Sequence, residues 1–128
     1  MPPNVRVQQV PVEDIASFVA LVIENPARFL NRRIDIASDE LNGPQAAEIV
    51  AAASGRAIEY VETPIAAAYE MSADAAKMFE WFDEVGYSAD IETLRGDYPE
   101  AGWQSFEQWV QAQDWSILDG NETTENAA

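Results

Sequence analysis

The beginning of the chain shows a strand pattern that runs into a helix pattern. Residues 7–12 (VQQVPV) predict a short strand, and the helix that follows reaches about Glu24, where Asn25-Pro26 interrupts it. One face of this helix carries apolar residues at the i, i+3, i+4, i+7 and i+8 positions, namely Ile15, Phe18, Val19, Val22 and Ile23. The opposite face is apolar too, through Ala16, Ala20 and Leu21. A helix that is apolar nearly all round is normally covered on most sides.

Two further strands and one helix are predicted in the middle of the chain. Residues 33–38 (RIDIAS) alternate polar and apolar side chains as a strand does, and residues 58–61 (IEYV) form a third short strand pattern. Between them, Asn42 predicts a helix N-cap with Gln45 in the reciprocal capping-box position, and Gly55 predicts a left-handed C-terminal cap. Because helices separate the strands, we expect parallel pairing in an α/β arrangement.

Only helical patterns follow Pro64. Residues 65–85 predict helix with a break near Ser72, a short helical piece is expected at 91–95, and Ser105 predicts the cap of a last helix. Three short strands make a poor sheet alone. We therefore expect an α/β fold that is the end of a larger sheet protein, with a few short strands alternating with helices and then a helical C-terminal region.

The length of 128 residues suits one domain. We expect it to fold over residues 5–118 and to end in a disordered acidic tail at residues 119–128, because DGNETTENAA is polar throughout. The start of the chain lacks the apolar core of a signal peptide, and no run of 18 apolar residues could span a membrane. These features predict a cytoplasmic protein.

Charge is the strongest compositional feature. The chain has 23 acidic residues against 7 basic ones, which gives a net charge of −16. This field repels phosphate backbones and anionic lipids, so we expect no nucleic acid and no membrane among the partners. An acid-rich surface with a single lysine suits a salt-rich cytoplasm, where a short Debye length screens self-repulsion. We interpret the source as halophilic, with an ordinary acidic protein as the alternative.

The chain lacks the residues that several kinds of catalytic chemistry need. The chain has no Cys and no His, which excludes thiolate chemistry, Ser-His-Asp triads and imidazole metal ligands. No stretch matches G-x-G-x-x-G, no Walker A motif is present, and no Tyr is followed four residues later by Lys. The acidic side chains of Asp35, Asp39 and Glu40 lack the spacing of a calcium loop and indicate a solvated face. No catalytic, cofactor-binding or metal-binding residue is predicted.

One aromatic group is a candidate wall of an apolar substrate pocket. Its members lie in or beside the helical region 65–85, and they are Tyr69, Met78, Trp81, Phe82 and Tyr87. Phe82 shares the apolar stripe of the helix, which favours a core position for it. Trp81 and Tyr87 fall off that stripe and are the better pocket candidates. A Tyr with no Lys or His neighbour is a poor proton donor, so packing is favoured for the tyrosines.

Two other groups have alternative interpretations. Asp14 follows the first strand and could orient a ligand, but an acidic residue there more often complements the start of a helix. The tryptophans near the C-terminus could bind a partner or pack in the core with equal justification, and they are Trp103, Trp109 and Trp115.

The order of these segments resembles a known family. VPVEDI, then RRIDIASDELNGPQAAEI, then GRAIEYV are similar to the region that follows the Rossmann core in NmrA-like proteins, which are atypical short-chain dehydrogenase/reductases. FDEVGYSADIETLRGDYPE and SFEQWV are similar to the family's last helices, so the resemblance covers about residues 5–115. It implies a Rossmann-type protein with NAD(P) in a crevice beside a smaller substrate domain. The family's Gly-rich loop belongs to an N-terminal half, so this chain corresponds to the C-terminal portion.

The resemblance implies a function with an alternative. We expect the substrate-side domain of an NAD(P)-binding oxidoreductase or redox sensor, in which residues 65–87 help to close the pocket. No cofactor is expected on this chain alone, and a separately encoded Rossmann half would supply NAD(P). The alternative is a stand-alone, non-enzymatic oligomerising or protein-interaction module that covers its apolar helix by self-association. A nonfunctional remnant is the third hypothesis.

Overall fold

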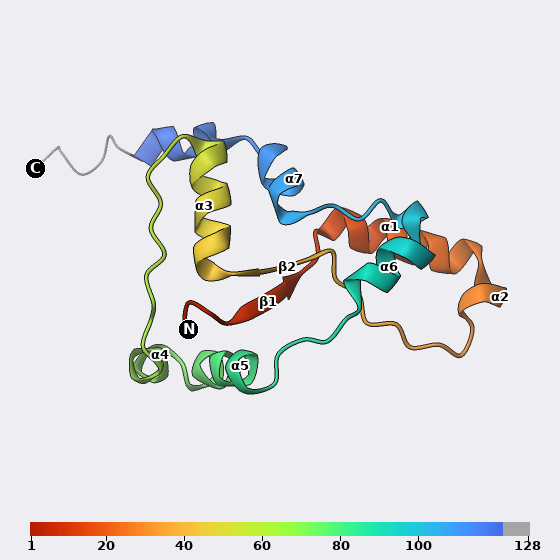
Figure 1. The fold of residues 1–128 in the computed structure, drawn as a ribbon, viewed down its shortest axis with the longest axis horizontal. Helices are drawn as coiled ribbons and strands as arrows, with labels where there is room; N and C mark the ends of the chain where they lie inside the picture. Colours follow the sequence, from red (N-terminus) through yellow and green to blue (C-terminus); the bar gives the residue numbers. More distant parts are fainter. Residues whose placement is uncertain (122–128) are drawn as a thin grey trace, which may run out of the picture.

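A two-stranded antiparallel sheet lies in the middle of the molecule, and helices surround it (Figure 1). The computed structural model describes residues 1–121. Strand β1 (Arg6–Gln9) pairs with β2 (Asp39–Asn42), so that Arg6 lies opposite Asn42 and Gln9 lies opposite Asp39. The described residues therefore form a mixed fold that is rich in helix and has a small sheet.

The helices follow the predicted order closely. Their bounds are α1 (Val12–Glu24), α2 (Pro26–Phe29), α3 (Gly43–Ser54), α4 (Ile65–Met71), α5 (Ala73–Glu84), α6 (Ile91–Asp97) and α7 (Phe106–Gln111), with 3₁₀ helices η1 (Pro99–Ala101) and η2 (Trp115–Asn121). The capping box predicted at Asn42 and the cap predicted at Ser105 are both formed, the second as a capping box with Gln108. Gly55 is left-handed with φ 68°, and Ser72 caps α5 at the predicted break.

The predicted strands are partly wrong, and so is the parallel pairing. Residues 33–38 form no strand, because Ile34 and Ile36 pack against the hydrophobic core from an extended loop. The alternation of that segment therefore reflects packing by a loop, and the paired strand β2 begins immediately after it. Residues 58–61 form no strand either, and Tyr60 instead lies over the start of α3. β1 and β2 run antiparallel.

The core lies between α1, α2 and the segment that contains α6 and η1. Phe18 of α1 is its centre, with ring centroids 5.8 Å from Phe29, 5.5 Å from Tyr98 and 5.4 Å from Trp103. The Trp103 indole N–H is buried and donates hydrogen bonds to the backbone carbonyls of Leu94 at 3.0 Å and Tyr98 at 2.9 Å. Of the two interpretations of Trp103, core packing is therefore confirmed.

The α4–α5 pair contacts the rest of the fold through α5 and β1, and hydrogen bonds before and after the pair add to this attachment. The side-chain amide of Gln8 donates to the carbonyl of Ala89 and accepts from its N–H, both at 2.9 Å. The N-terminal ammonium of Met1 donates to the Thr63 carbonyl at 2.9 Å. The pair packs on itself and lies apart from α1 and α6 (Figure 1). Its attachment therefore depends on the ends of β1 and on the segment after α5.

The predicted acidic tail falls mostly outside the described residues. Residues 119–121 belong to η2, and Asp119 accepts a hydrogen bond from Arg56 at 2.8 Å. Residues 122–128 lie outside the part of the chain that the structure describes. Among residues 1–121, no helix combines the length and apolar character that crossing a bilayer requires.

Two helical glycines should respond to alanine in opposite directions. A Cβ at Gly43 would lie 2.0 Å from Cε2 of Tyr60, so Gly43→Ala should lower the free energy of unfolding by about 1–3 kcal/mol. A Cβ at Gly96 in α6 meets nothing within 4 Å, so Gly96→Ala should raise it by about 0.4–1 kcal/mol. Urea denaturation of both variants measures the two changes in the free energy of unfolding. If Gly43→Ala also raised the free energy of unfolding, the Tyr60 ring would have to move away without cost.

Candidate functional site

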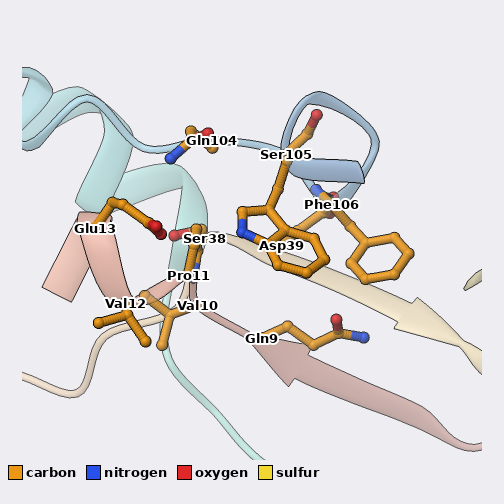
Figure 2. Close-up of a pocket in the computed structure, with 11 residues that line it drawn as sticks. Gln9, Val10, Pro11, Val12, Glu13, Ser38, Asp39, Gln104, Ser105 and Phe106 are labelled. Carbon is orange, nitrogen blue, oxygen red and sulfur yellow. Dashed lines mark hydrogen bonds between the residues drawn. The ribbon is translucent and has the colours of Figure 1, made fainter. Parts of the chain in front are cut away.

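An apolar cleft opens where the end of β1, the start of α1 and the start of α7 meet (Figure 2). Its volume is about 350 Å³. We call it the junction cleft, and its lining consists of Gln9, Val10, Pro11, Val12, Glu13, Ser38, Asp39, Gln104, Ser105, Phe106 and Trp109. The lining comes from three segments that are far apart in the sequence, so the folded chain creates the cleft.

Asp14, which is not part of the lining, holds these segments together. It is only 2% exposed, and one carboxylate oxygen accepts from the Ser38 hydroxyl at 2.6 Å and from the Gln104 N–H at 2.8 Å. The other oxygen accepts from the Gln104 side-chain amide at 2.9 Å. Asp14 lies in the first turn of α1, but its carboxylate makes no cap hydrogen bond. Joining three segments is therefore a role that neither sequence interpretation included.

Asp39 makes a second connection across the cleft. Its two carboxylate oxygens accept from the N–H of Phe106 at 2.7 Å and from the N–H of Glu40 at 2.8 Å. The bond to Phe106 fixes the start of α7 against β2. With the Asp14 contacts, it sets the two sides of the cleft in place before any ligand arrives.

The cleft has an aromatic wall and an acidic rim. The rings of Phe106 and Trp109 stack with centroids 6.3 Å apart and an interplanar angle of 27°, and both are half-buried. Figure 2 shows Val10 and Val12 on the side of α1 and Phe106 on the side of α7. The lining contains the carboxylates of Glu13 and Asp39 but no Lys or Arg.

The predicted pocket residues are brought together in part. The rings of Trp81, Phe82 and Tyr87 form one cluster, with centroids 5.0 Å apart for Trp81 and Tyr87. Trp81 and Tyr87 line a second depression of about 600 Å³. We call it the aromatic hollow, and it is lined by Gln8, Gln9, Val10, Arg33, Ile34, Asp35, Ile36, Trp81, Gly86, Tyr87, Ser88 and Ala89.

The other three predicted residues lie outside that lining. Phe82 is half-buried and contacts Trp81 and Tyr87 by ring packing. Met78 is exposed on α5, and the Tyr69 hydroxyl donates to the Glu80 carboxylate at 2.8 Å. Trp81 and Tyr87, which the helix period had separated from the apolar stripe, are thus the two that face the hollow.

Two tyrosines have phenols that are weaker acids than usual. The hydrogen bond to Glu80 is the main cause that raises the pKa of Tyr69. Burial is the main cause that raises the pKa of Tyr60, and the nearby Glu62 adds to it. Both hydroxyls remain protonated at neutral pH, which makes neither an activated proton donor.

The described residues do not fit the pyrophosphate of NAD(P). A pyrophosphate is held by a glycine-lined turn whose amides open a helix. Among residues 1–121, Gly43 is the glycine that begins a helix, and the Tyr60 ring occupies the space beside its Cα. The start of α1 carries Glu13 and Asp14, which would repel a phosphate.

The acidic trio considered for a metal is engaged in other contacts. Asp39 accepts backbone amides, Glu40 pairs with Arg6 at 2.7 Å, and Asp35 pairs with Arg33 at 3.3 Å. Within the described part of the chain, no three metal-ligating side chains converge.

Comparison with known proteins identifies one family. The family model described as "NmrA-like family" matches residues 1–112. That range contains both depressions. No match is found among curated proteins.

Proposed function

The chain belongs to the NmrA-like family, an NAD(P)-binding family, and from that premise we propose that it is the substrate-side domain of an oxidoreductase or redox sensor. The observation that carries the proposal is the aromatic hollow, which has the size of a small-molecule site and a wall made of Trp81 and Tyr87. In this proposal NAD(P) is held by a Rossmann half outside the described residues, because these residues offer no phosphate cradle.

The residues of the hollow have separate roles in this proposal. Trp81 and Tyr87 provide the aromatic surface that contacts the substrate, and Phe82 supports both rings from behind. Ile34 and Ile36 add apolar surface to the lining from the loop before β2. The paired hydrogen bonds between Gln8 and Ala89 fix the rim that follows Tyr87. The chain binds and positions the substrate, and the reactive chemistry comes from the partner.

The first test is cofactor binding by the purified chain. We expect calorimetry with NADPH to show no binding up to millimolar concentrations. The pyrophosphate would meet the acidic start of α1, and the Tyr60 ring fills the space beside Gly43 at the start of α3. Titrations at low and high KCl separate simple charge repulsion from a missing site. An NADPH-binding reductase in the same buffers serves as the positive control. Micromolar affinity of this chain would overturn the proposal.

A second candidate function is favoured by the exposed face of α1. At about 100° per residue, six apolar residues occupy a continuous arc of roughly 140°, and they are Val12, Ile15, Ala16, Val19, Ala20 and Ile23. All six are exposed in the described structure, with Val12 at 75% and Ile23 at 72%. The prediction that this helix is covered on most sides is therefore wrong for residues 1–121 taken alone.

Self-association through this arc would make the chain a stand-alone interaction module. Light scattering at low and high KCl distinguishes the two candidates. A dimer that Val19→Asp dissociates favours the module. A monomer at all concentrations favours the substrate-side domain, whose α1 then meets the Rossmann half.

A further inference from the structure

We propose that the junction cleft binds a small organic cation with an aromatic or aliphatic body, of the arylalkylamine type. The cleft shares Gln9 and Val10 with the aromatic hollow, but its aromatic wall is a different one, made of Phe106 and Trp109. The inference does not depend on the proposed function. It follows from three properties of the cleft, which are its shape, its charge and its rigidity.

The shape suits a single ring system. The cleft volume of about 350 Å³ falls in the range of small-molecule sites. Phe106 and Trp109 remain half-exposed, so their ring surfaces are available to a ligand. Val10, Pro11 and Val12 supply an apolar surface at the end of β1. A flat apolar body therefore finds both aromatic and aliphatic contacts.

The charge of the lining selects the head group. The Glu13 carboxylate is exposed and makes no hydrogen bond or ion pair with any described residue. Asp39 adds a second negative charge, although backbone amides occupy both of its oxygens. The face of an indole attracts cations as well. An ammonium group is therefore favoured over a hydroxyl of similar size, and a carboxylate is repelled.

Nearby basic groups do not change this preference. Arg95 reaches the backbone next to the cleft, where it donates to the carbonyls of Ser38 at 2.7 Å and Trp103 at 3.1 Å. Its guanidinium keeps its positive charge, but Arg95 is not part of the lining, and the three carboxylates of Glu13, Asp14 and Asp39 outnumber it there. The net charge of −16 strengthens the attraction for any cation at long range, so a test must separate this field from the site.

The cleft is also preorganised. In its lining, Gln104 is hydrogen-bonded to Asp14 and Phe106 is hydrogen-bonded to Asp39. A ligand therefore does not have to order the two sides of the cleft, which lowers the cost of binding.

The experiment uses three probes with one ring system, namely 2-naphthylmethylamine, 2-naphthylmethanol and 2-naphthoate. Calorimetry with the full chain should show the amine binding about tenfold more tightly than the alcohol, and no binding of the carboxylate. Trp109→Ala should weaken both the amine and the alcohol. Glu13→Gln, at an exposed position that tolerates change, should weaken the amine about threefold to tenfold and leave the alcohol unchanged.

Two control variants make the result specific. Glu70→Gln removes the same charge from an exposed position on α4 and should leave amine binding unchanged. Trp81→Ala alters the aromatic hollow and should also leave it unchanged. Equal binding of the three probes, no binding of the amine, or equal effects of Glu13→Gln and Glu70→Gln would each overturn the proposal. Loss of binding in Trp81→Ala alone would place the amine in the hollow and overturn it too.

Discussion

Asp14→Ala should lower the free energy of unfolding by about 3–5 kcal/mol in urea denaturation. The carboxylate is buried and accepts three hydrogen bonds, from the Ser38 hydroxyl and from two N–H groups of Gln104. Alanine leaves these donors without their acceptor in a site that water does not fill freely. The measurement belongs at a KCl concentration at which the unmodified chain is fully folded, because the net charge of −16 destabilises it at low salt.

The neighbouring carboxylate provides the matched control. Glu13 lies in the same helical turn but is exposed and makes no hydrogen bond to a described residue, so Glu13→Ala should change stability by no more than about 0.5 kcal/mol. Asp14→Asn keeps the shape while it removes the charge, and its effect should fall between the two. If Asp14→Ala and Glu13→Ala cost the same, the buried connection does not stabilise the fold.

Phe18→Ala should cost about 3–5 kcal/mol, because it removes the ring around which the core is built. Phe18 contacts Phe29, Tyr98 and Trp103 through ring pairs and belongs to the buried core cluster, so its removal leaves a cavity among these rings. Near-ultraviolet circular dichroism should also weaken, since Trp103 loses its fixed neighbour. Urea denaturation gives the energy and the spectrum reports the packing.

The adjacent residue, Val19, provides the control for Phe18. Val19 follows Phe18 on α1 but lies on the exposed arc, so Val19→Ala should change stability by at most about 0.5 kcal/mol in the monomer. A large loss in Val19→Ala together with a small one in Phe18→Ala would mean that α1 is buried on the opposite face in solution.

Local signals predicted the helices well and the strands poorly. Asn42 with Gln45 and Ser105 with Gln108 specify helix starts within four residues, so the structure could be anticipated from short segments. Strand pairing depends on a partner elsewhere in the chain. Residues 33–38 have the right alternation, but Ile34 and Ile36 meet the core instead of a neighbouring strand.

The candidate sites show the same difference between local signals and long-range contacts. Trp81 and Tyr87 could be selected because they fall off the apolar stripe of one helix, which is visible in the sequence. The segments around the junction cleft are held by the contact between Asp14 and Gln104, which lie 90 positions apart, and no local pattern connects these two residues. Asp14 could be singled out from the sequence only because it follows the first strand at the start of a helix. That signal identified the residue but not its partners.

The Gln8–Ala89 contact has a consequence for motion. The Gln8 side-chain amide both donates to and accepts from the backbone of Ala89, as a residue in a paired strand would. This contact is one of few polar links between the α4–α5 pair and the remaining fold. Since the buried residues of α4 and α5 are the small side chains Ala68 and Ala76, this pair should open at lower free energy than α1 does. The Trp81 wall of the aromatic hollow therefore belongs to a unit whose amide hydrogens should exchange earlier than those of α1. A ligand bound in the aromatic hollow should slow amide hydrogen exchange most in the α4–α5 pair.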